Sequence, residues 1–362
     1  MSLGDAALGV SWRRAGMSRS ILLGCAILLV LAFVFSLAVG PVVIAPARVL
    51  NILWDGVFGI RSGSGTDLRD AAVVLDIRLP RTVLAALVGA SLGVAGAVLQ
   101  GIFRNPLADP QLVGISPGAA LAAVAWIVFG GLLAPYLPAF LLSYALPFAS
   151  FAGSLLAIVL LHRLAAHEGR TPVASLLFAG IALGSLASAG VGLIIFVASD
   201  QQLREFTFWT LGSLGGSTWP RVALIAPFAA AIFLGALWIA RGLDALALGE
   251  AEAFHIGINV EWLKRIAIAI VAGGVGAAVA VSGVIGFVGL VVPHLLRLSA
   301  GPAHRTVFIG SALLGAALLT GADIFARTIA APAELPIGVV TALIGAPFFI
   351  WLLRRNRRAF GA

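Results

Sequence analysis

The sequence predicts an all-α integral membrane protein, a single transmembrane domain over residues 1–362 with ten transmembrane helices. Three observations predict this fold class. Hydrophobic residues make up 61% of the 362 residues and charged residues only 10%, whereas soluble globular proteins carry roughly a quarter charged residues. The mean hydropathy is +1.09. Apolar stretches long enough to cross a bilayer, roughly 20 residues, recur along the chain.

Short polar or proline-containing connections separate the apolar segments. The expected spans are residues 20–40, 80–102, 113–132, 139–162, 173–198, 219–240, 264–284, 286–298, 306–325 and 336–353. The first follows three arginines, as a signal peptide would, but its apolar run exceeds the roughly 7–15 residues of a signal peptide. We therefore expect an uncleaved span. The eighth is short for a full crossing. An even number of spans places both termini on one side of the membrane.

Basic residues orient the chain, because lysine and arginine collect in cytoplasmic loops. With the N-terminus in the cytoplasm, 15 of the 23 basic residues fall on the cytoplasmic side. We therefore expect both termini in the cytoplasm. The net charge of +8 then reflects membrane topology. The sequence shows no basic–aromatic pattern of the kind that binds nucleic acid.

Arginines mark the outer ends of two spans. The run from Ile77 to Arg81 places Arg78 and Arg81 beside Pro80, and Arg327 lies shortly before Pro332. Isolated surface arginines usually contribute little. Guanidinium groups held at rigid helix ends are, however, suited to bidentate pairing with carboxylates. We expect these three arginines to receive a docking protein.

The connection after the second span contains helix-breaking residues, with Asn105, Pro106 and Pro110 between Phe103 and the third span. At membrane depth, non-helical backbone is tolerated only where it is buried in protein or lines a water-filled cavity. The segment is either a plain turn between two spans or a constriction that acts as a gate, and we favour the gate.

Glycines recur at the spacing used for helix packing, as in Gly89-x-x-x-Gly93, Gly96 and Gly180-x-x-x-Gly184. In lipid the hydrophobic effect does not drive helices together, so small residues that permit close approach are favoured at their interfaces. We expect these glycines to lie where helices pack tightly.

The segment Leu243 to Lys264 is polar, favours helix and lies on the cytoplasmic side. It is too hydrophilic to span a membrane, yet its apolar residues could form one face. A solvated connector would not need such a face. The segment is therefore either a connector or a helix that docks a soluble partner.

Several kinds of chemistry are excluded. Lys264 is the only lysine and Arg265 follows it, so the sequence holds no Walker A motif. ATP and magnesium would have to be bound by a separate polypeptide.

All fifteen acidic residues are expected in loops or at span ends. Ion-coupled carriers commonly place ionisable groups within the membrane, so this distribution argues against an ion-coupled secondary transporter. No catalytic, metal-binding or cofactor-binding motif is present.

Together these segments resemble the permeases of vitamin B12, siderophore and haem ABC importers, the type II importer family. The matching segments, in family order, are residues 77–81, 103–110, 112–116, 209–213, 247–250, 286–294 and 334–338. They cover nearly the whole chain, and as a set they are highly specific.

The resemblance implies a homodimeric permease in the bacterial inner membrane, two cytoplasmic ABC ATPase subunits and a periplasmic substrate-binding protein. It implies that Arg78, Arg81 and Arg327 dock the binding protein and that Asn105 and Leu107 belong to a cytoplasmic gate. The coupling helix would contact the ATPase through Gly249, Glu250, Ala253 and Gly257. In some relatives a second gate precedes the fifth span. Here Val173, Ala174 and Ser175 occupy that place and the role is left open.

Haem is the favoured cargo, because residues 200–204 and 326–334 look closest to haem-importer permeases. Arg204 could pair with a haem propionate, or it could meet lipid headgroups or a loop carboxylate. Ferric siderophores and vitamin B12 remain alternatives as cargo.

Overall fold

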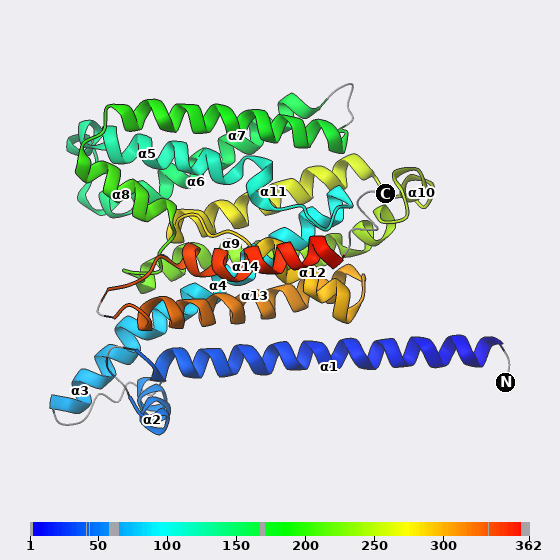
Figure 1. Ribbon diagram of the computed structural model, residues 1–362, viewed down its shortest axis with the longest axis horizontal. Helices are drawn as coiled ribbons and strands as arrows, with labels where there is room; N and C mark the ends of the chain where they lie inside the picture. The colour runs from blue at the N-terminus through cyan, green and yellow to red at the C-terminus, as the bar shows by residue number, and fades with distance from the viewer. Residues whose placement is uncertain are drawn as a thin grey trace.

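The computed structural model describes residues 3–40, 42, 44–57, 65–166, 171–331 and 333–355, and its regular elements are all helices within these ranges (Figure 1). The long helices are α1 (Leu3–Ala38), α4 (Leu79–Phe103), α5 (Ile115–Leu133), α6 (Ala139–Ala165), α7 (Val173–Phe196), α9 (Trp219–Leu246), α11 (Val260–Ser282), α12 (Val288–Ala300), α13 (His304–Thr328) and α14 (Ile337–Arg355). The shorter ones are α2 (Pro46–Val57), α3 (Gly65–Ala72), α8 (Asp200–Thr210) and α10 (Glu250–His255), with a π-helical turn η1 (Val73–Arg78) and two 3-10 turns, η2 (Pro110–Val113) and η3 (Ala134–Tyr136).

Every expected span corresponds to one long helix. The ends differ by a few residues, except that α1 begins at Leu3, well before the expected start at residue 20. Eight helices in the described ranges are long and apolar enough to cross a membrane, while α12 and α14 are shorter apolar helices. The all-helical membrane fold is confirmed. The count of ten crossings stays a prediction, since it depends on these two helices.

Helix α4 lies at the centre of the molecule and packs against α9, α11, α12 and α13. Every residue from Ser91 to Phe103 is buried. Glycines permit these contacts, as their spacing predicted. A Cβ atom at Gly96 would lie 1.7 Å from the backbone oxygen of Gly289, and one at Gly89 would lie 2.2 Å from that of Gly315. The second glycine pair packs less closely, because a Cβ at Gly184 would meet only Pro117, at 3.7 Å.

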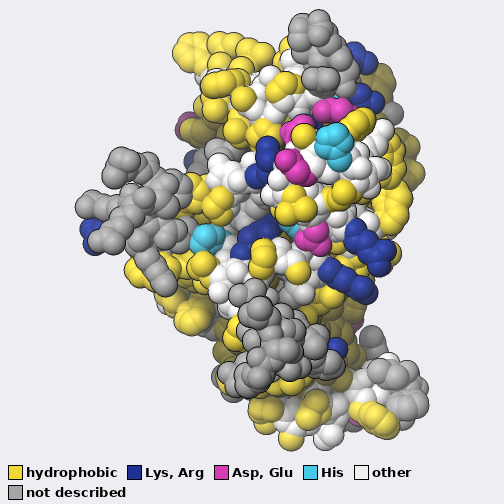
Figure 2. Space-filling view, turned by 90° about the vertical axis from the view of Figure 1, so that its right-hand side faces the viewer, with side chains coloured by type: hydrophobic (Ala, Val, Ile, Leu, Met, Phe, Trp, Pro, Cys, Tyr) yellow, Lys and Arg dark blue, Asp and Glu magenta, His cyan; other side chains and the backbone are white. Residues whose placement is uncertain are grey.

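The two ends of the molecule differ. The start of α1, the end of α14 and α10 lie at one end, and α2, α3 and α8 lie at the other (Figure 1). Figure 2 looks onto the α10 end, where basic and acidic side chains gather. Four arginines at the helix ends on this side are exposed, namely Arg104, Arg241, Arg265 and Arg305. We call this the α10 end and the opposite one the outer end.

Sequence reasoning did not anticipate α2, α3 and α8, because these helices are too short or too polar to register as spans. Helix α8 begins with a capping box, in which Ser199 and Gln202 satisfy each other's backbone N–H groups. Helices α3 and α4 are continuous through η1. Pro80 lacks the N–H that would continue the regular ladder, and just before it Leu79 donates to the oxygen of Val74, five residues back.

Candidate functional site

The first of the three predicted docking arginines, Arg78, is buried at the outer end. It donates hydrogen bonds to backbone oxygens at the end of α1 and just beyond it, those of Leu37 at 2.7 Å, Ala38 at 3.0 Å and Val42. The last carbonyl groups of a helix lack partners within it and favour a cation. Arg78 therefore caps α1, and the expectation of an accessible guanidinium is wrong for this residue.

Arg327 is also buried, near the end of α13. Its Nη2 donates to the backbone oxygen of Ser36 at 2.5 Å and lies 2.9 Å from the Ser36 hydroxyl oxygen. Its Nε lies 3.6 Å from Oδ2 of Asp323. Arg327 thus ties α13 to α1, so it too differs from the accessible guanidinium that was expected.

Arg81 is the one of the three whose side chain approaches the surface, at 12% exposure. Its Nε and Nη2 donate to the carboxylate of Asp323 at distances of 2.8–3.1 Å. Its Nη1 donates to Oε1 of Glu334 at 2.7 Å, and the Glu334 side chain is 44% exposed. Arg81 is therefore held between a buried carboxylate below and an exposed one above.

Asp323 corrects the expectation that every acidic residue lies in a loop or at a span end. It lies within α13, five residues before the last residue of that helix, and is 1% exposed. Two arginines surround it, Arg81 from α4 and Arg327 from its own helix. A buried carboxylate is retained only when paired in this way, so Asp323 reads as a structural ion partner.

The predicted gate forms a tight turn at the α10 end. Arg104 ends α4 in the left-handed region, with φ of 48°. Oδ1 of Asn105 accepts a hydrogen bond from the backbone N–H of Leu107 at 2.9 Å, and the Asn105 carbonyl accepts one from Ala108 at 3.1 Å. Asn105 is exposed and Leu107 half-buried. The structure thus brings the two gate residues together in one turn.

The turn continues into η2 through Asp109, whose Oδ1 accepts from the N–H of Gln111 at 2.8 Å. Burial raises the pKa of the Asp109 carboxyl to about 6, against the lowering effect of that hydrogen bond. A cavity of about 210 Å³ adjoins the turn and is lined by Gln100, Gly101, Arg104, Asn105, Pro106, Ala247, Arg297 and His304.

The predicted coupling segment folds as α10, a helix of six residues that lies between two glycines of positive φ. Gly249 has φ of 139° and Gly257 has φ of 86°, conformations that glycine adopts far more readily than other residues. Ala253 is completely buried and faces the bundle. The flanking helices extend further into the 243–264 segment than expected, since α9 ends at Leu246 and α11 begins at Val260.

Three apolar side chains project from this segment into the surroundings. Leu248, Phe254 and Ile256 are 73%, 72% and 64% exposed. We call them the α10 apolar face. Exposed apolar groups with polar residues around them are typical of a protein-interaction site. The arrangement favours a docking helix over a solvated connector.

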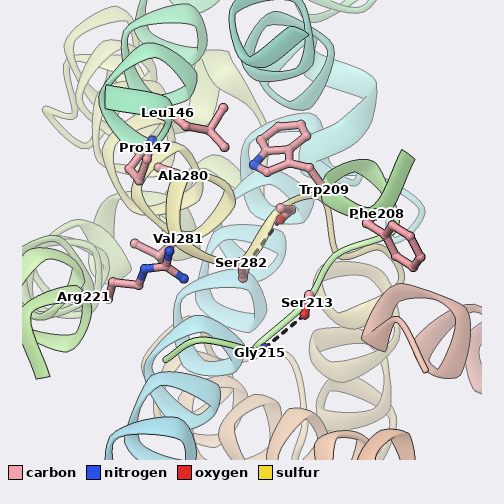
Figure 3. Close-up of a pocket in the computed structure, with 11 residues that line it drawn as sticks. Leu146, Pro147, Phe208, Trp209, Ser213, Gly215, Arg221, Ala280, Val281 and Ser282 are labelled. Atoms are coloured by element: carbon pink, nitrogen blue, oxygen red, sulfur yellow. Dashed lines mark hydrogen bonds between the residues drawn. The ribbon is translucent and has the colours of Figure 1, made fainter. Parts of the chain in front are cut away.

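Arg204 lies exposed on α8. A cavity of about 170 Å³ opens nearby at the outer end, lined by the end of α8, the following loop and residues of α6, α9 and α11 (Figure 3). Phe208, Trp209 and Arg221 contribute an aromatic wall and a cation. Sequence reasoning placed Arg221 only among the outer arginines. Its position directly after Trp219-Pro220, at the start of α9, was the only feature of the sequence that could have indicated a role at the outer end.

The sequence left open whether Val173, Ala174 and Ser175 form a second gate. They form the first turn of α7, which Pro172 caps. Ala174 is exposed, and Val173 and Ser175 are half-buried. These residues lie well apart in sequence from Asn105 and Leu107, and the structure shows no hydrogen bond between the two groups in the part of the chain that it describes.

Comparisons with known proteins agree with this architecture. Residues 28–355 match the FecCD transport family. The hemin transport system permease protein HmuU of Yersinia pestis is 46% identical over 284 residues, 78% of this chain and 83% of that protein. The vitamin B12 import system permease protein BtuC of Escherichia coli is 39% identical over 340 residues, 93% of this chain and 95% of that protein.

A solved structure is similar over nearly the whole chain. An inward-facing conformation of a metal-chelate type ABC transporter superposes with a TM-score of 0.78 at 31% identity, and covers 93% of this chain and 99% of that one. The resemblance inferred from the sequence motifs is therefore confirmed. This chain belongs to the FecCD transport family and is a multi-pass membrane permease of the ABC transporter type.

Proposed function

We propose that this chain is the transmembrane subunit of an ATP-driven importer that moves haem across the bacterial inner membrane. Two copies would form the translocation path between them, with both termini in the cytoplasm. A periplasmic binding protein would deliver the cargo to the outer end, and two cytoplasmic ABC ATPase subunits would bind at the α10 end. The observation that carries the proposal is the α10 apolar face, which lies at the same end of the molecule as the start of α1 and the end of α14 (Figure 1).

The energy for transport would come from a partner ATPase, because residues 1–362 hold no Walker A motif. The single lysine of the chain precedes an arginine, so ATP and magnesium would be bound by the partner ATPase. Displacement of α10 when the ATPase closes would tilt α9 and α11, which adjoin it in the chain. The turn at Asn105 and Leu107 would then open or close the inner side of the path.

Haem is favoured over other cargo by two observations. The relative named as a hemin permease shares 46% identity over 78% of this chain. At the outer end, Arg221 and Trp209 line one cavity, and Arg204 lies exposed on the same helix as Trp209. Arginine suits a carboxylate such as a propionate, and aromatic faces suit a flat ring system.

Reconstituted vesicles test both the mechanism and the cargo. The permease, its ATPase and its binding protein would be combined, and uptake and ATP hydrolysis measured with haem, vitamin B12 and a ferric siderophore. We expect ATP-dependent uptake of haem above the other two. Preferential uptake of vitamin B12 or the siderophore would replace haem as cargo. Uphill uptake by the permease alone, driven by an ion gradient, would show a secondary carrier instead.

Docking of the binding protein is proposed to centre on Arg81, because Arg78 and Arg327 are buried. Its exposed partner Glu334 occupies the position that a carboxylate of the docking protein would take. Arg78 and Arg327 would contribute by holding α1 and α13 in place beneath it. Binding measured with Arg81→Gln should weaken, and unchanged binding would remove the assignment.

A further inference from the structure

Lys264, the only lysine of the chain, is completely enclosed near the start of α11. It is 1% exposed and ranks among the largest fully buried side chains. Its ammonium group lies 3.0 Å from Oε1 of Glu250, 3.3 Å from Oε1 of Glu261 and 3.1 Å from the backbone oxygen of Thr171. These three partners belong to α10, to α11 and to the segment just before α7.

A second contact closes the arrangement. The Thr171 hydroxyl donates a hydrogen bond to Oε2 of Glu261 at 2.5 Å, and Thr171 is itself buried. Glu250 is the first residue of α10, which carries the α10 apolar face. We call Lys264, Glu250, Glu261 and Thr171 the lysine junction.

The chemistry of the lysine junction makes it rigid. An ammonium group has three N–H donors and no acceptor, and here three oxygens surround it. Burying an unpaired charge is very unfavourable, so losing one carboxylate leaves the ammonium poorly compensated inside the protein. The Glu250 and Glu261 side chains are 42% and 24% exposed, but the ammonium end of both ion pairs is buried, so water competes for it less than it does at a surface ion pair. Displacement of α10 should therefore carry Lys264 and Thr171 with it.

The residues after Thr171 connect this displacement of α10 to the start of α7. Pro172 follows, and α7 begins at the next residue, Val173. Proline holds its φ angle near one value. Because rotation at Pro172 is restricted, a shift of Thr171 should also move the first turn of α7. This turn is where a second gate would lie.

We infer that Lys264 is a positioning residue that transmits movement of α10 to the start of α7. The inference rests on the proposed function, in which the ATPase moves α10. It assigns to the lysine junction a role distinct from contact with the ATPase, because Lys264 is buried beneath α10 and cannot touch a docked protein.

The test uses the full complex of permease, ATPase and binding protein in vesicles, with haem as cargo. The measured quantity is cargo moved per ATP hydrolysed. Lys264→Met retains the apolar stem and removes the charge. Coupling free energies between sites typically correspond to factors of roughly 5 to 150, and we expect the ratio to fall by a factor in that range while hydrolysis continues. Lys264→Arg should restore part of the ratio.

Arg265→Met is the matched control, since it removes the same charge from the neighbouring position, where the side chain is exposed. Its ratio should equal that of the wild type. Thr171→Val serves as a second variant in case Lys264→Met does not assemble, because it removes only the hydroxyl group that donates to Glu261 within the junction. It should also lower the ratio.

Hydrogen–deuterium exchange supplies a readout that loss of stability alone would not reproduce. Trapping the wild-type complex with ATP should change exchange in α10 and in residues 173–178 together. In Lys264→Met the change in α10 should persist and that in α7 should disappear. Equal transport ratios, or an unaltered response of α7, would overturn the inference alone. Failure of the wild-type complex to couple hydrolysis to uptake would instead overturn the proposed function.

Discussion

At the residue scale, the outer end shows one side-chain type used in two ways. Arg78 and Arg327 satisfy backbone oxygens of α1 and the connection after it, and neither reaches the surface. Arg81 pairs with two carboxylates of different exposure, Asp323 and Glu334. A charge reversal at Arg78 would therefore break the cap of α1 as well as any docking contact, so a substitution there cannot report on docking alone.

Asp323→Asn should strongly destabilise the protein, because it leaves Arg81 and Arg327 without their buried carboxylate. Breaking a buried ion pair costs about 3–5 kcal/mol. Glu334→Gln is the matched control, since it removes the exposed partner of the same arginine and should cost no more than about 1 kcal/mol. Thermal unfolding of the purified variants in detergent measures both. Similar losses in the two variants would contradict the assigned roles.

Asp109 makes stability depend on pH. Burial raises the pKa of its carboxyl to about 6 in the folded protein, above its unfolded value of about 3.9. The folded state therefore holds the proton more tightly, and stability falls as pH rises from about 4 to about 6. Asp109→Asn retains an oxygen to accept from Gln111 and removes the titration. Unfolding curves between pH 4 and 8 should show a smaller dependence in this variant, and parallel curves would exclude the effect.

At the scale of elements, most helices were predictable and their polar connections were not. Apolar segments of sufficient length are visible in the sequence, so the long helices were located within a few residues, apart from the start of α1, which extends to Leu3 through a less apolar segment. The ion pairs of Arg81 with Asp323 and Glu334 join residues 242 and 253 positions apart. No local pattern reveals such pairing. The enclosure of Lys264 could not be predicted for the same reason, because it depends on Thr171, 93 residues earlier.

The close approach of α4 to α12 gives the sharpest prediction for an element. Gly96→Ala would place a methyl group 1.7 Å from the Gly289 backbone oxygen, so the two helices must separate. Overpacking of this kind typically costs about 1–3 kcal/mol or more. Gly24→Ala in α1, where nothing lies within 4 Å, should be neutral or slightly stabilising, since alanine favours helix. Unfolding midpoints in detergent compare them, and equal midpoints would refute the packing argument.

At the scale of the whole molecule, charge and apolar surface are arranged along one axis. The outer end carries the arginine network and the cavity beside Trp209 (Figure 3). The α10 end carries the α10 apolar face and four exposed arginines, Arg104, Arg241, Arg265 and Arg305. The polar character of the 243–264 segment was evident from the sequence, and its cytoplasmic orientation stays a prediction. The exposure of Phe254 beside the enclosed Ala253 required the structure, because it depends on how α10 packs on the bundle.

Phe254→Ala should weaken association with the ATPase, because the Phe254 ring on α10 is apolar and 72% exposed. Aromatic residues are common among the few that dominate interface energies, at about 2 kcal/mol or more each. Tyr136→Ala removes an exposed ring at the outer end and should leave association unchanged. Co-purification of the ATPase with each variant measures this, and equal recovery would place the interface elsewhere.

The enclosure of the single lysine also has a practical consequence. Among the side chains of residues 1–362, reagents that acylate primary amines have only Lys264 as a target, and Lys264 is 1% exposed. A dye of that class added to the intact assembly would leave the transmembrane subunit nearly unstained beside its lysine-bearing companions. Labelling of Lys264 would then show that the packing around the start of α11 had been lost.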